Sequence, residues 1–136
     1  MNHLLKAISE ANNFLLKETD IHNALQNCIT ALGRNIEINR CYIFKNEIEN
    51  DKLVLNYEYE WCCTNTIPFI GSPDLSGHTY DAFPGLFEPL SQNKPFYGLV
   101  KESTNTFFKE IMEMQSIKSY LFTPIFSEDN FWGWIG

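Results

Sequence analysis

The stretch Leu53–Cys62 constrains the fold of this 136-residue chain more than any other feature, because its side chains alternate in character. Large apolar or aromatic side chains occupy every second position from Leu53 to Trp61, and mostly polar ones lie between them. Successive side chains of a β-strand point to opposite faces, so a period of two predicts a strand with one buried and one wet face. Strands of this kind are typical of antiparallel sheets.

Two amphipathic helices are predicted ahead of this strand. Apolar side chains recur at helical spacing within Leu4–Leu16 and again within Ile21–Ile36, with polar residues on the opposite side. Thr19 and Asp20 separate the two stretches, and both are residue types that cap the start of a helix. The chain is therefore expected to open with two helices in series.

The rest of the chain is predicted to form strands and short helices around one long irregular segment. Arg40–Phe44 is apolar on both faces and indicates a central strand, and Asn50-Asp51 is a turn signal. The proline-containing segment Thr64–Lys94 is unusually long for a loop, and such loops are often functional. Further elements are expected as a short helix near Tyr80–Leu90, strands at Pro95–Val100, Ser119–Phe126 and Asn130–Gly136, and a helix at Thr104–Gln115. This order predicts an α+β fold with a central antiparallel sheet.

Composition excludes several classes of function. The length suits one domain, residues 1–136. The net charge of −7 argues against a nucleic-acid partner or an anionic membrane, and no apolar run is long enough for membrane insertion. The first twenty residues carry too many charges for a secretory signal, so a cytoplasmic location is expected. The four cysteines lack metal-binding spacing, so we expect free thiols and no metal site, and no catalytic motif is present.

Five stretches, in this order along the chain, resemble the GAF domain, a small-molecule sensor module of bacterial signalling proteins. They are "INRCYIF", "YEYEW", "LSQNKPFYGLV", "QSIKSYLFTPIF" and "NFWGWIG". The resemblance implies a sheet with terminal helices on one face and a lid over a ligand pocket on the other. The segment Thr64–Leu90 would supply the lid and Thr104–Gln115 a wall of the pocket.

The resemblance also implies where a ligand would bind. Aromatic side chains would dominate the lining, with polar groups of the lid among them, although each aromatic is also a plausible core residue. The candidate pocket residues are Tyr59, Trp61, Phe69, His78, Tyr80, Phe83, Phe87, Phe96, Tyr120, Phe122 and Trp132.

Two kinds of prosthetic group known in the family find little support in these residues. Bilin-binding relatives attach the pigment through a cysteine beside a histidine, and the corresponding positions here are Thr106 and Phe107. Haem would need an axial ligand, and His78 is the one histidine of the lid. A redox function would use Cys62 or Cys63 as a sensing thiol, although adjacent strand residues point to opposite faces and are poorly placed to pair.

Three functions remain open. The first is a regulatory domain without catalysis of its own, which binds a small molecule and controls a linked output domain such as a histidine kinase or a diguanylate cyclase. The second is a stand-alone redox enzyme or thiol sensor, and the third is a dimerisation module with a collapsed pocket. The apolar end Phe131–Gly136 is expected to be a truncated core strand of a longer protein. An uncovered stripe on Leu4–Leu16 would then favour a homodimer through the first helix.

Overall fold

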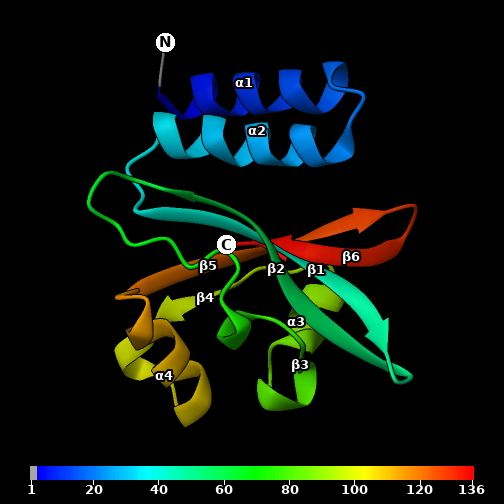
Figure 1. The fold of residues 1–136 in the computed structure, drawn as a ribbon, viewed down its shortest axis with the longest axis vertical. Coiled ribbons are helices and arrows are strands. Elements are labelled where there is room, and N and C mark those ends of the chain that lie inside the picture. The colour runs from blue at the N-terminus through cyan, green and yellow to red at the C-terminus, as the bar shows by residue number, and fades with distance from the viewer. Residues whose placement is uncertain (1–2) are drawn as a thin grey trace. The chain divides into compact units, whose positions relative to one another are not determined.

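The computed structural model describes residues 3–136 and confirms the predicted α+β fold (Figure 1). Six strands form one sheet in the order β3-β2-β1-β6-β5-β4. The pairs β1–β6, β2–β3, β4–β5 and β5–β6 are antiparallel, and a tight turn joins β1 to β2. The helices are α1 (His3–Lys17), α2 (Ile21–Asn35), α3 (Phe87–Ser91) and α4 (Thr106–Met114). The strands are β1 (Arg40–Glu49), β2 (Lys52–Cys62), β3 (His78–Thr79), β4 (Phe96–Leu99), β5 (Ser119–Ser127) and β6 (Asn130–Ile135).

The chain divides into two compact units, and the division falls within β1 and β2. The first unit contains the chain up to Tyr42 together with Tyr59–Ile70. The second contains Ile43–Glu58 and Gly71–Gly136, and therefore most of the sheet. No helix within residues 3–136 has the length and apolar character needed to cross a membrane.

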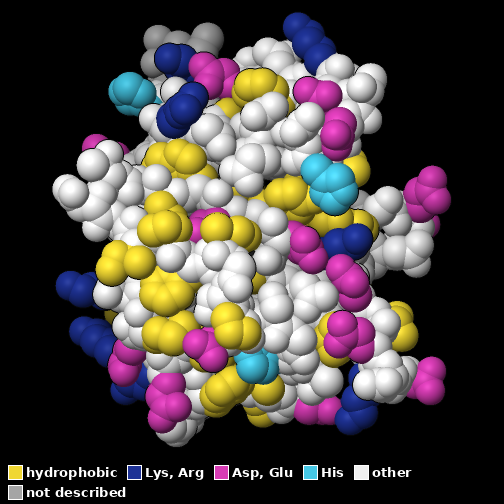
Figure 2. Space-filling model, in the orientation of Figure 1, with side chains coloured by type: hydrophobic (Ala, Val, Ile, Leu, Met, Phe, Trp, Pro, Cys, Tyr) yellow, Lys and Arg dark blue, Asp and Glu magenta, His cyan; other side chains and the backbone are white. Residues whose placement is uncertain are grey.

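The first unit opens with the two predicted helices, which lie side by side (Figure 1). Asp20 caps α2 as predicted, because its Oδ1 accepts the N–H of His22 at 2.9 Å. Small side chains of α1 are buried, namely Ala7 and Ala11, and α2 contributes Ala24, Ala31 and Ile29 to the same core. The larger side chains of α1 are mostly exposed: Leu4, Leu5, Ile8, Phe14, Leu15 and Leu16. Figure 2 shows hydrophobic side chains at the surface on the face drawn there.

Close packing joins α2 to the end of β2 within the first unit. A Cβ atom at Gly33 would lie 2.2 Å from the indole ring of Trp61, so only glycine lets this ring rest against the helix. Gln26 donates to the backbone oxygen of Glu60 at 3.1 Å. His22 and the hydroxyl of Tyr59 also form a hydrogen bond. The last residues of β2 are thus held in place by contacts with α2.

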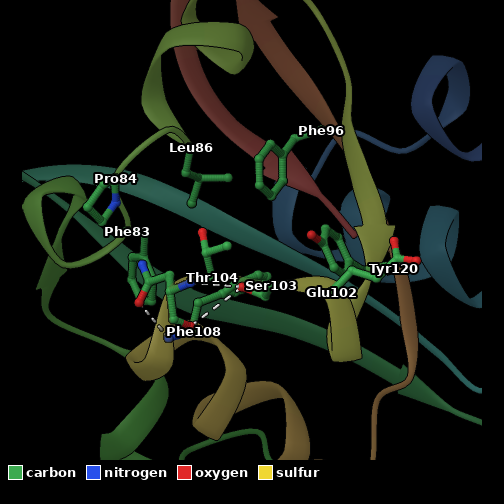
Figure 3. Close-up of a pocket in the computed structure, with 10 residues that line it drawn as sticks. Phe83, Pro84, Leu86, Phe96, Glu102, Ser103, Thr104, Phe108 and Tyr120 are labelled. Atoms are coloured by element: carbon green, nitrogen blue, oxygen red, sulfur yellow. Dashed lines mark hydrogen bonds between the residues drawn. The ribbon is translucent and has the colours of Figure 1, made fainter.

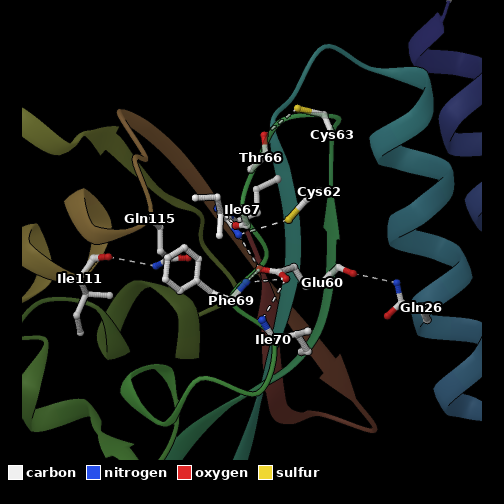
Figure 4. Close-up of polar contacts among 11 residues, drawn as sticks. Gln26, Glu60, Cys62, Cys63, Thr66, Ile67, Phe69, Ile70, Ile111 and Gln115 are labelled. Atoms are coloured by element: carbon white, nitrogen blue, oxygen red, sulfur yellow. Dashed lines mark hydrogen bonds and ion pairs between the residues drawn. The ribbon is translucent and has the colours of Figure 1, made fainter.

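A buried ion pair lies at the start of β1 and the end of β2 (Figure 4). Arg40 Nη1 and Glu60 Oε2 are 2.7 Å apart, and their side chains are 4% and 3% exposed. The carboxylate of Glu60 also accepts the N–H groups of Phe69 at 3.0 Å and Ile70 at 3.1 Å. Arg40 donates to the carbonyl of Ile67 at 2.8 Å, and its guanidinium lies 5.3 Å from the ring centre of Phe69. Residues 67–70 are thereby held to both strands.

The predicted alternation of β2 is confirmed on one face and corrected at two positions on the other. Leu55, Tyr57 and Tyr59 are buried as expected. Glu60 was expected to be wet, but residues 67–70 cover its carboxylate with backbone N–H donors. Val54 is also buried, and its partner Thr79 lies in β3, a two-residue strand that the sequence analysis did not predict.

The core of the second unit is a continuous stack of aromatic rings centred on β6. Trp134 is buried between Phe44 of β1 and Phe122 of β5, with ring centres 4.4 and 4.3 Å away. The register pairs Phe44 with Trp134 and Pro124 with Trp134. The apolar stretch at residues 131–135 is therefore an inner strand of the sheet, with neighbours on both sides.

The turn predicted at Asn50-Asp51 is confirmed by its backbone angles, and the turn between β5 and β6 has the same conformation. Asn50 and Asp51 have φ values of 51° and 62°, and Glu128 and Asp129 have values of 50° and 68°. Two consecutive residues in the left-handed region are typical of the tight turns whose twist matches that of paired strands. Asparagine and aspartate tolerate this conformation better than most residues, which explains three of the four positions.

Candidate ligand pocket

The second unit contains a pocket of about 250 Å³ (Figure 3). Its walls come from the chain ahead of α3, from β4 and β5, and from the turn that leads into α4. The lining residues are Phe83, Pro84, Leu86, Phe96, Glu102, Ser103, Thr104, Asn105, Phe108 and Tyr120. A pocket that combines an apolar lining with a few polar groups is typical of small-molecule sites, and this volume suits a ligand smaller than most drugs.

The floor of the pocket is apolar. Phe83, Leu86 and Phe108 are each less than 10% exposed. The rings of Phe83 and Phe108 meet edge to face, with their centres 6.2 Å apart. Edge-to-face packing is a favoured arrangement of aromatic rings, so these side chains form a fixed surface rather than a loose one.

Tyr120 and Phe96 form a half-buried aromatic wall across β4 and β5. Their rings are nearly parallel with centres 5.6 Å apart, and Phe108 approaches Tyr120 edge-on at 5.1 Å. Gly98 pairs with Tyr120 in the sheet, and a Cβ atom there would lie 3.0 Å from the phenolic oxygen. Glycine at this position leaves the space that the phenol occupies.

The electrostatics of this wall favour a neutral phenol. Burial raises the pKa of Tyr120, and the negative charge of Glu102 raises it further. The side chain of Tyr120 therefore remains a hydroxyl, able to donate one hydrogen bond and to accept others.

The polar rim lies at the start of α4, and its hydrogen bonds fix its shape. Asn105 caps the helix, because its Oδ1 accepts the N–H of Phe108 at 3.1 Å and its Nδ2 donates to the carbonyl of Ala82 at 3.2 Å. The N–H of Asn105 donates to Ser103 Oγ at 3.3 Å. The amide of Asn105 thus links α4 to the chain ahead of α3.

The structure brings three of the predicted pocket residues together and places the others elsewhere. Phe83, Phe96 and Tyr120 line this pocket. Tyr59, Trp61 and Phe69 belong to the first unit, where they contact His22, Gly33 and Arg40 respectively. Phe122, Tyr80, Phe87, His78 and Trp132 lie in the second unit but not among the lining residues of this pocket.

These five residues of the second unit have other neighbours. Phe122 is buried against Trp134, and Tyr80 donates to Asn46 and contacts Phe87. The ring centre of Trp132 lies 5.8 Å from Lys45 Nζ. His78 is bonded through Nε2 to the carbonyl of Asp74 at 2.7 Å and meets the rings of Phe83 and Phe107 edge-on.

Most of the rim and part of the floor were not among the individual pocket candidates. Pro84 and Leu86 lie in the segment expected to form the lid, and Thr104, Asn105 and Phe108 lie in the segment expected to form a wall. Glu102 and Ser103 lie outside both predicted segments. The sequence did contain one signal for the rim. Asn105 is a residue type that caps helices and directly precedes the apolar residues of α4, so the residues next to it were expected at the start of that helix.

The positions that correspond to bilin attachment begin α4. Thr106 is the first residue of that helix, and the ring of Phe107 stacks on Phe83 at 5.5 Å. Neither side chain is a thiol or an imidazole. Among residues 3–136 the structure holds no group of three or more His, Cys, Asp and Glu side chains arranged for a metal ion.

The two candidate redox cysteines lie in the first unit and differ in environment. Hydrogen bonds from Thr66 and then Asn39 lower the pKa of Cys63, with Sγ 3.0 Å from the Thr66 hydroxyl. Burial raises the pKa of Cys62, whose Sγ lies 3.4 Å from Arg40 Nη1. All four cysteines of the chain are free thiols.

No protein-family model matches the chain. The methanogenesis regulatory histidine kinase FilI from Methanothrix harundinacea (strain 6Ac) is 33% identical over 136 residues, which cover 99% of this chain and 15% of the kinase. The chain thus spans a small part of that relative.

Solved structures agree on the fold. The phycocyanobilin-bound GAF domain from a cyanobacterial phytochrome superposes with a TM-score of 0.76 at 16% identity, over 99% of this chain and 78% of that one. The GAF domain of a two-component sensor histidine kinase from Bacillus halodurans superposes with a TM-score of 0.59 at 18% identity, over 85% of this chain and 74% of that one. These superpositions agree with the element order and sheet described above. The chain has the fold of a GAF domain.

Proposed function

We propose that this chain is the sensory domain of a larger signalling protein, in which a small molecule bound in the pocket of the second unit controls a linked output domain. The observation that carries the proposal is a pocket with an aromatic floor and a polar rim in a chain with the GAF fold. The similarity to a regulatory histidine kinase over 15% of the kinase's length supports an output domain elsewhere in the same protein. We assign no catalytic step to this domain, and we place it in the cytoplasm.

A screen of small metabolites tests the binding step. Ligands are detected by the change in melting temperature and confirmed by calorimetry. A Thr104→Trp variant fills the rim of the pocket from an exposed position, so it should fold and lose binding. Thr64→Trp adds the same ring at an exposed position of the first unit and should bind normally. A ligand that binds both variants equally would lie outside this pocket.

The control of output is tested by joining the chain to a histidine kinase core. A ligand found in the screen should change the rate of autophosphorylation, and Thr104→Trp should abolish the change. A ligand that binds without any effect on phosphorylation would separate binding from signalling and would contradict the second half of the proposal.

A homodimer through α1 is part of the same proposal. Leu5 is 60% exposed and Leu16 is 84% exposed, although both are large apolar side chains. Such side chains favour a second surface, and a symmetric pairing of α1 helices would cover them in both copies. Sedimentation should show weak self-association that a Leu5→Lys and Leu16→Lys double variant removes. A wild-type chain that stays monomeric at millimolar concentration would contradict this pairing.

A thiol sensor is the second candidate, favoured by the surroundings of Cys63. The hydroxyl of Thr66 and the amide of Asn39 stabilise a thiolate there, which is the reactive form. Mild peroxide should then oxidise Cys63 before the other thiols and change the phosphorylation rate of the joined kinase. A Cys63→Ser variant with an unchanged response to peroxide would contradict this role.

A further inference from the structure

The pocket contains one charged side chain, and it is negative. Glu102 is the sole ionisable acid or base among the ten lining residues apart from the phenol of Tyr120. Among residues 3–136 no lysine, arginine or histidine forms a salt bridge with Glu102. The net charge of −7 adds a field of the same sign, which raises the local concentration of cations and lowers that of anions.

Four aromatic rings line the same pocket as this carboxylate, and their planes differ in direction. Phe96 and Tyr120 are nearly parallel, with 26° between their planes, whereas Phe108 stands at 65° to Tyr120 and Phe83 at 84° to Phe108. The face of an aromatic ring carries partial negative charge, and faces turned in several directions attract a cation that has no hydrogens to donate. Alkylated ammonium groups are commonly recognised by several aromatic side chains together.

The start of α4 is the one feature of the pocket that would favour an anion. A helix N-terminus carries a partial positive charge of roughly one half. Here the N–H of Phe108 is already bound to the side chain of Asn105 and the N–H of Lys109 to its carbonyl. The full negative charge of Glu102 therefore exceeds what the helix end offers to an anion.

We infer that the pocket binds a small organic cation, an alkylated ammonium whose charged head lies against Phe96 and Tyr120 beside Glu102. The inference rests on the proposed sensory function and names the chemical class of its ligand. The alkyl groups of the cation contact the apolar floor formed by Phe83, Leu86 and Phe108. The volume of about 250 Å³ limits the ligand to a compact molecule.

A matched pair of probes tests the charge directly. Choline and 3,3-dimethylbutan-1-ol have the same shape, and only choline carries a charge. We expect choline to bind about tenfold more tightly by calorimetry, which corresponds to about 1.4 kcal/mol and lies within the range of cation–aromatic contacts. Thr104→Trp should abolish binding of both probes, which places them in the pocket.

Two variants assign the preference to named residues. Glu102→Gln should weaken choline several-fold and leave the neutral probe unchanged, whereas Glu110→Gln, at an exposed position of α4 outside the pocket, should change neither. Phe96→Leu keeps an apolar side chain but removes a ring face, so it should reduce the preference for choline. Melting curves of each variant confirm that it is folded.

The outcomes separate this inference from the proposed function. Equal affinity for both probes, or a choline affinity unchanged by Glu102→Gln, would overturn the cation inference while the pocket remained a binding site. Binding of neither probe at millimolar concentration would also overturn the inference, and the metabolite screen would then decide the sensory proposal by itself. A choline preference lost in both variants and kept in Glu110→Gln supports the inference.

Discussion

Replacement of Glu60 by glutamine tests whether the buried ion pair holds residues 67–70 in place. Glutamine has nearly the same shape, but it has no charge and turns one acceptor oxygen into a donor. In one orientation that donor would face the N–H groups of Phe69 and Ile70, and in the other it would face Phe69 and the guanidinium of Arg40. Arg40 would keep its charge with a side chain only 4% exposed.

The expected loss of stability is large because one charge stays behind. Removal of one partner from a buried ion pair costs about 3–5 kcal/mol, mainly through the uncompensated charge. A domain is stable by about 5–15 kcal/mol, so Glu60→Gln should remove a substantial fraction of the total. For a chain of this length, that loss lowers the melting temperature by about 10–25 °C.

Urea unfolding followed by tryptophan fluorescence measures the change, and amide exchange reports where it occurs. The N–H groups of Phe69 and Ile70 should exchange faster in Glu60→Gln. Glu58→Gln changes an exposed carboxylate of the same strand and should cost less than about 0.5 kcal/mol. Addition of Arg40→Met to Glu60→Gln should recover part of the lost stability, because it removes the charge left behind while glutamine keeps one acceptor oxygen for the N–H groups of Phe69 and Ile70. A Glu60→Gln protein within 1 kcal/mol of the wild type, with unchanged exchange at Phe69, would refute this reasoning.

Three further changes test other parts of the structure. Gly98→Ala should cost about 1–3 kcal/mol in urea unfolding, because its Cβ atom would lie 3.0 Å from Tyr120 Oη; the same cost in a Tyr120→Phe background would show that the hydroxyl is not the obstacle. Iodoacetamide at neutral pH should label Cys63 before Cys62 and Cys41, since hydrogen bonds lower the pKa of Cys63 and burial raises the pKa of the other two thiols. Mass spectrometry that finds Cys41 labelled first would contradict this order. Burial, and secondly the charge of Cys28, raises the pKa of Cys41 from 9.0 to about 12. The buried thiol therefore stabilises the fold fully below pH 9, and this stabilisation is lost as the pH rises towards 12, by on the order of 2 kcal/mol at pH 11. The urea midpoints at pH 8 and pH 11 should differ less in Cys41→Ala than in the wild type, and an equal difference would mean that another group causes the alkaline sensitivity.

Local patterns predicted the elements of the fold well because their causes are local. Alternation over residues 53–61 gave β2, and the caps and turns followed from Asp20, Asn50 and Asp51, whose side chains act within a few residues of the backbone they shape. The strand β3 was missed because it has two residues, His78 and Thr79, too few for any period to appear.

The pocket was predicted less well because its residues meet across long separations in sequence. Phe107 and Phe108 are adjacent aromatic residues on α4, yet Phe108 is buried in the pocket floor and Phe107 is 38% exposed. Helical spacing alone does not tell which of two neighbours faces the cavity. The position of Trp61 likewise depends on a residue distant in sequence. Its ring rests against α2 because Gly33, 28 residues earlier, has no side chain.

The two carboxylates of Glu60 and Glu102 show how one residue type takes opposite roles. Sequence patterns assigned neither to a buried or functional position. Glu60 is covered by protein and must be paired, because an isolated buried charge is too costly, and Arg40 with two backbone N–H groups supplies the pairing. Glu102 stays in contact with water, so the fold demands no partner for it, yet it lies beside aromatic rings that would strengthen its attraction for a cation. A charge that the protein has already paired serves stability, and a charge that it leaves exposed beside a hydrophobic pocket is available to a ligand.

The different roles of the two carboxylates can be measured. Glu60→Gln should change the free energy of unfolding far more than ligand affinity, and Glu102→Gln should change choline affinity while the free energy of unfolding stays within about 0.5 kcal/mol of the wild type. The reverse pattern would mean that exposure does not separate the two roles in this protein.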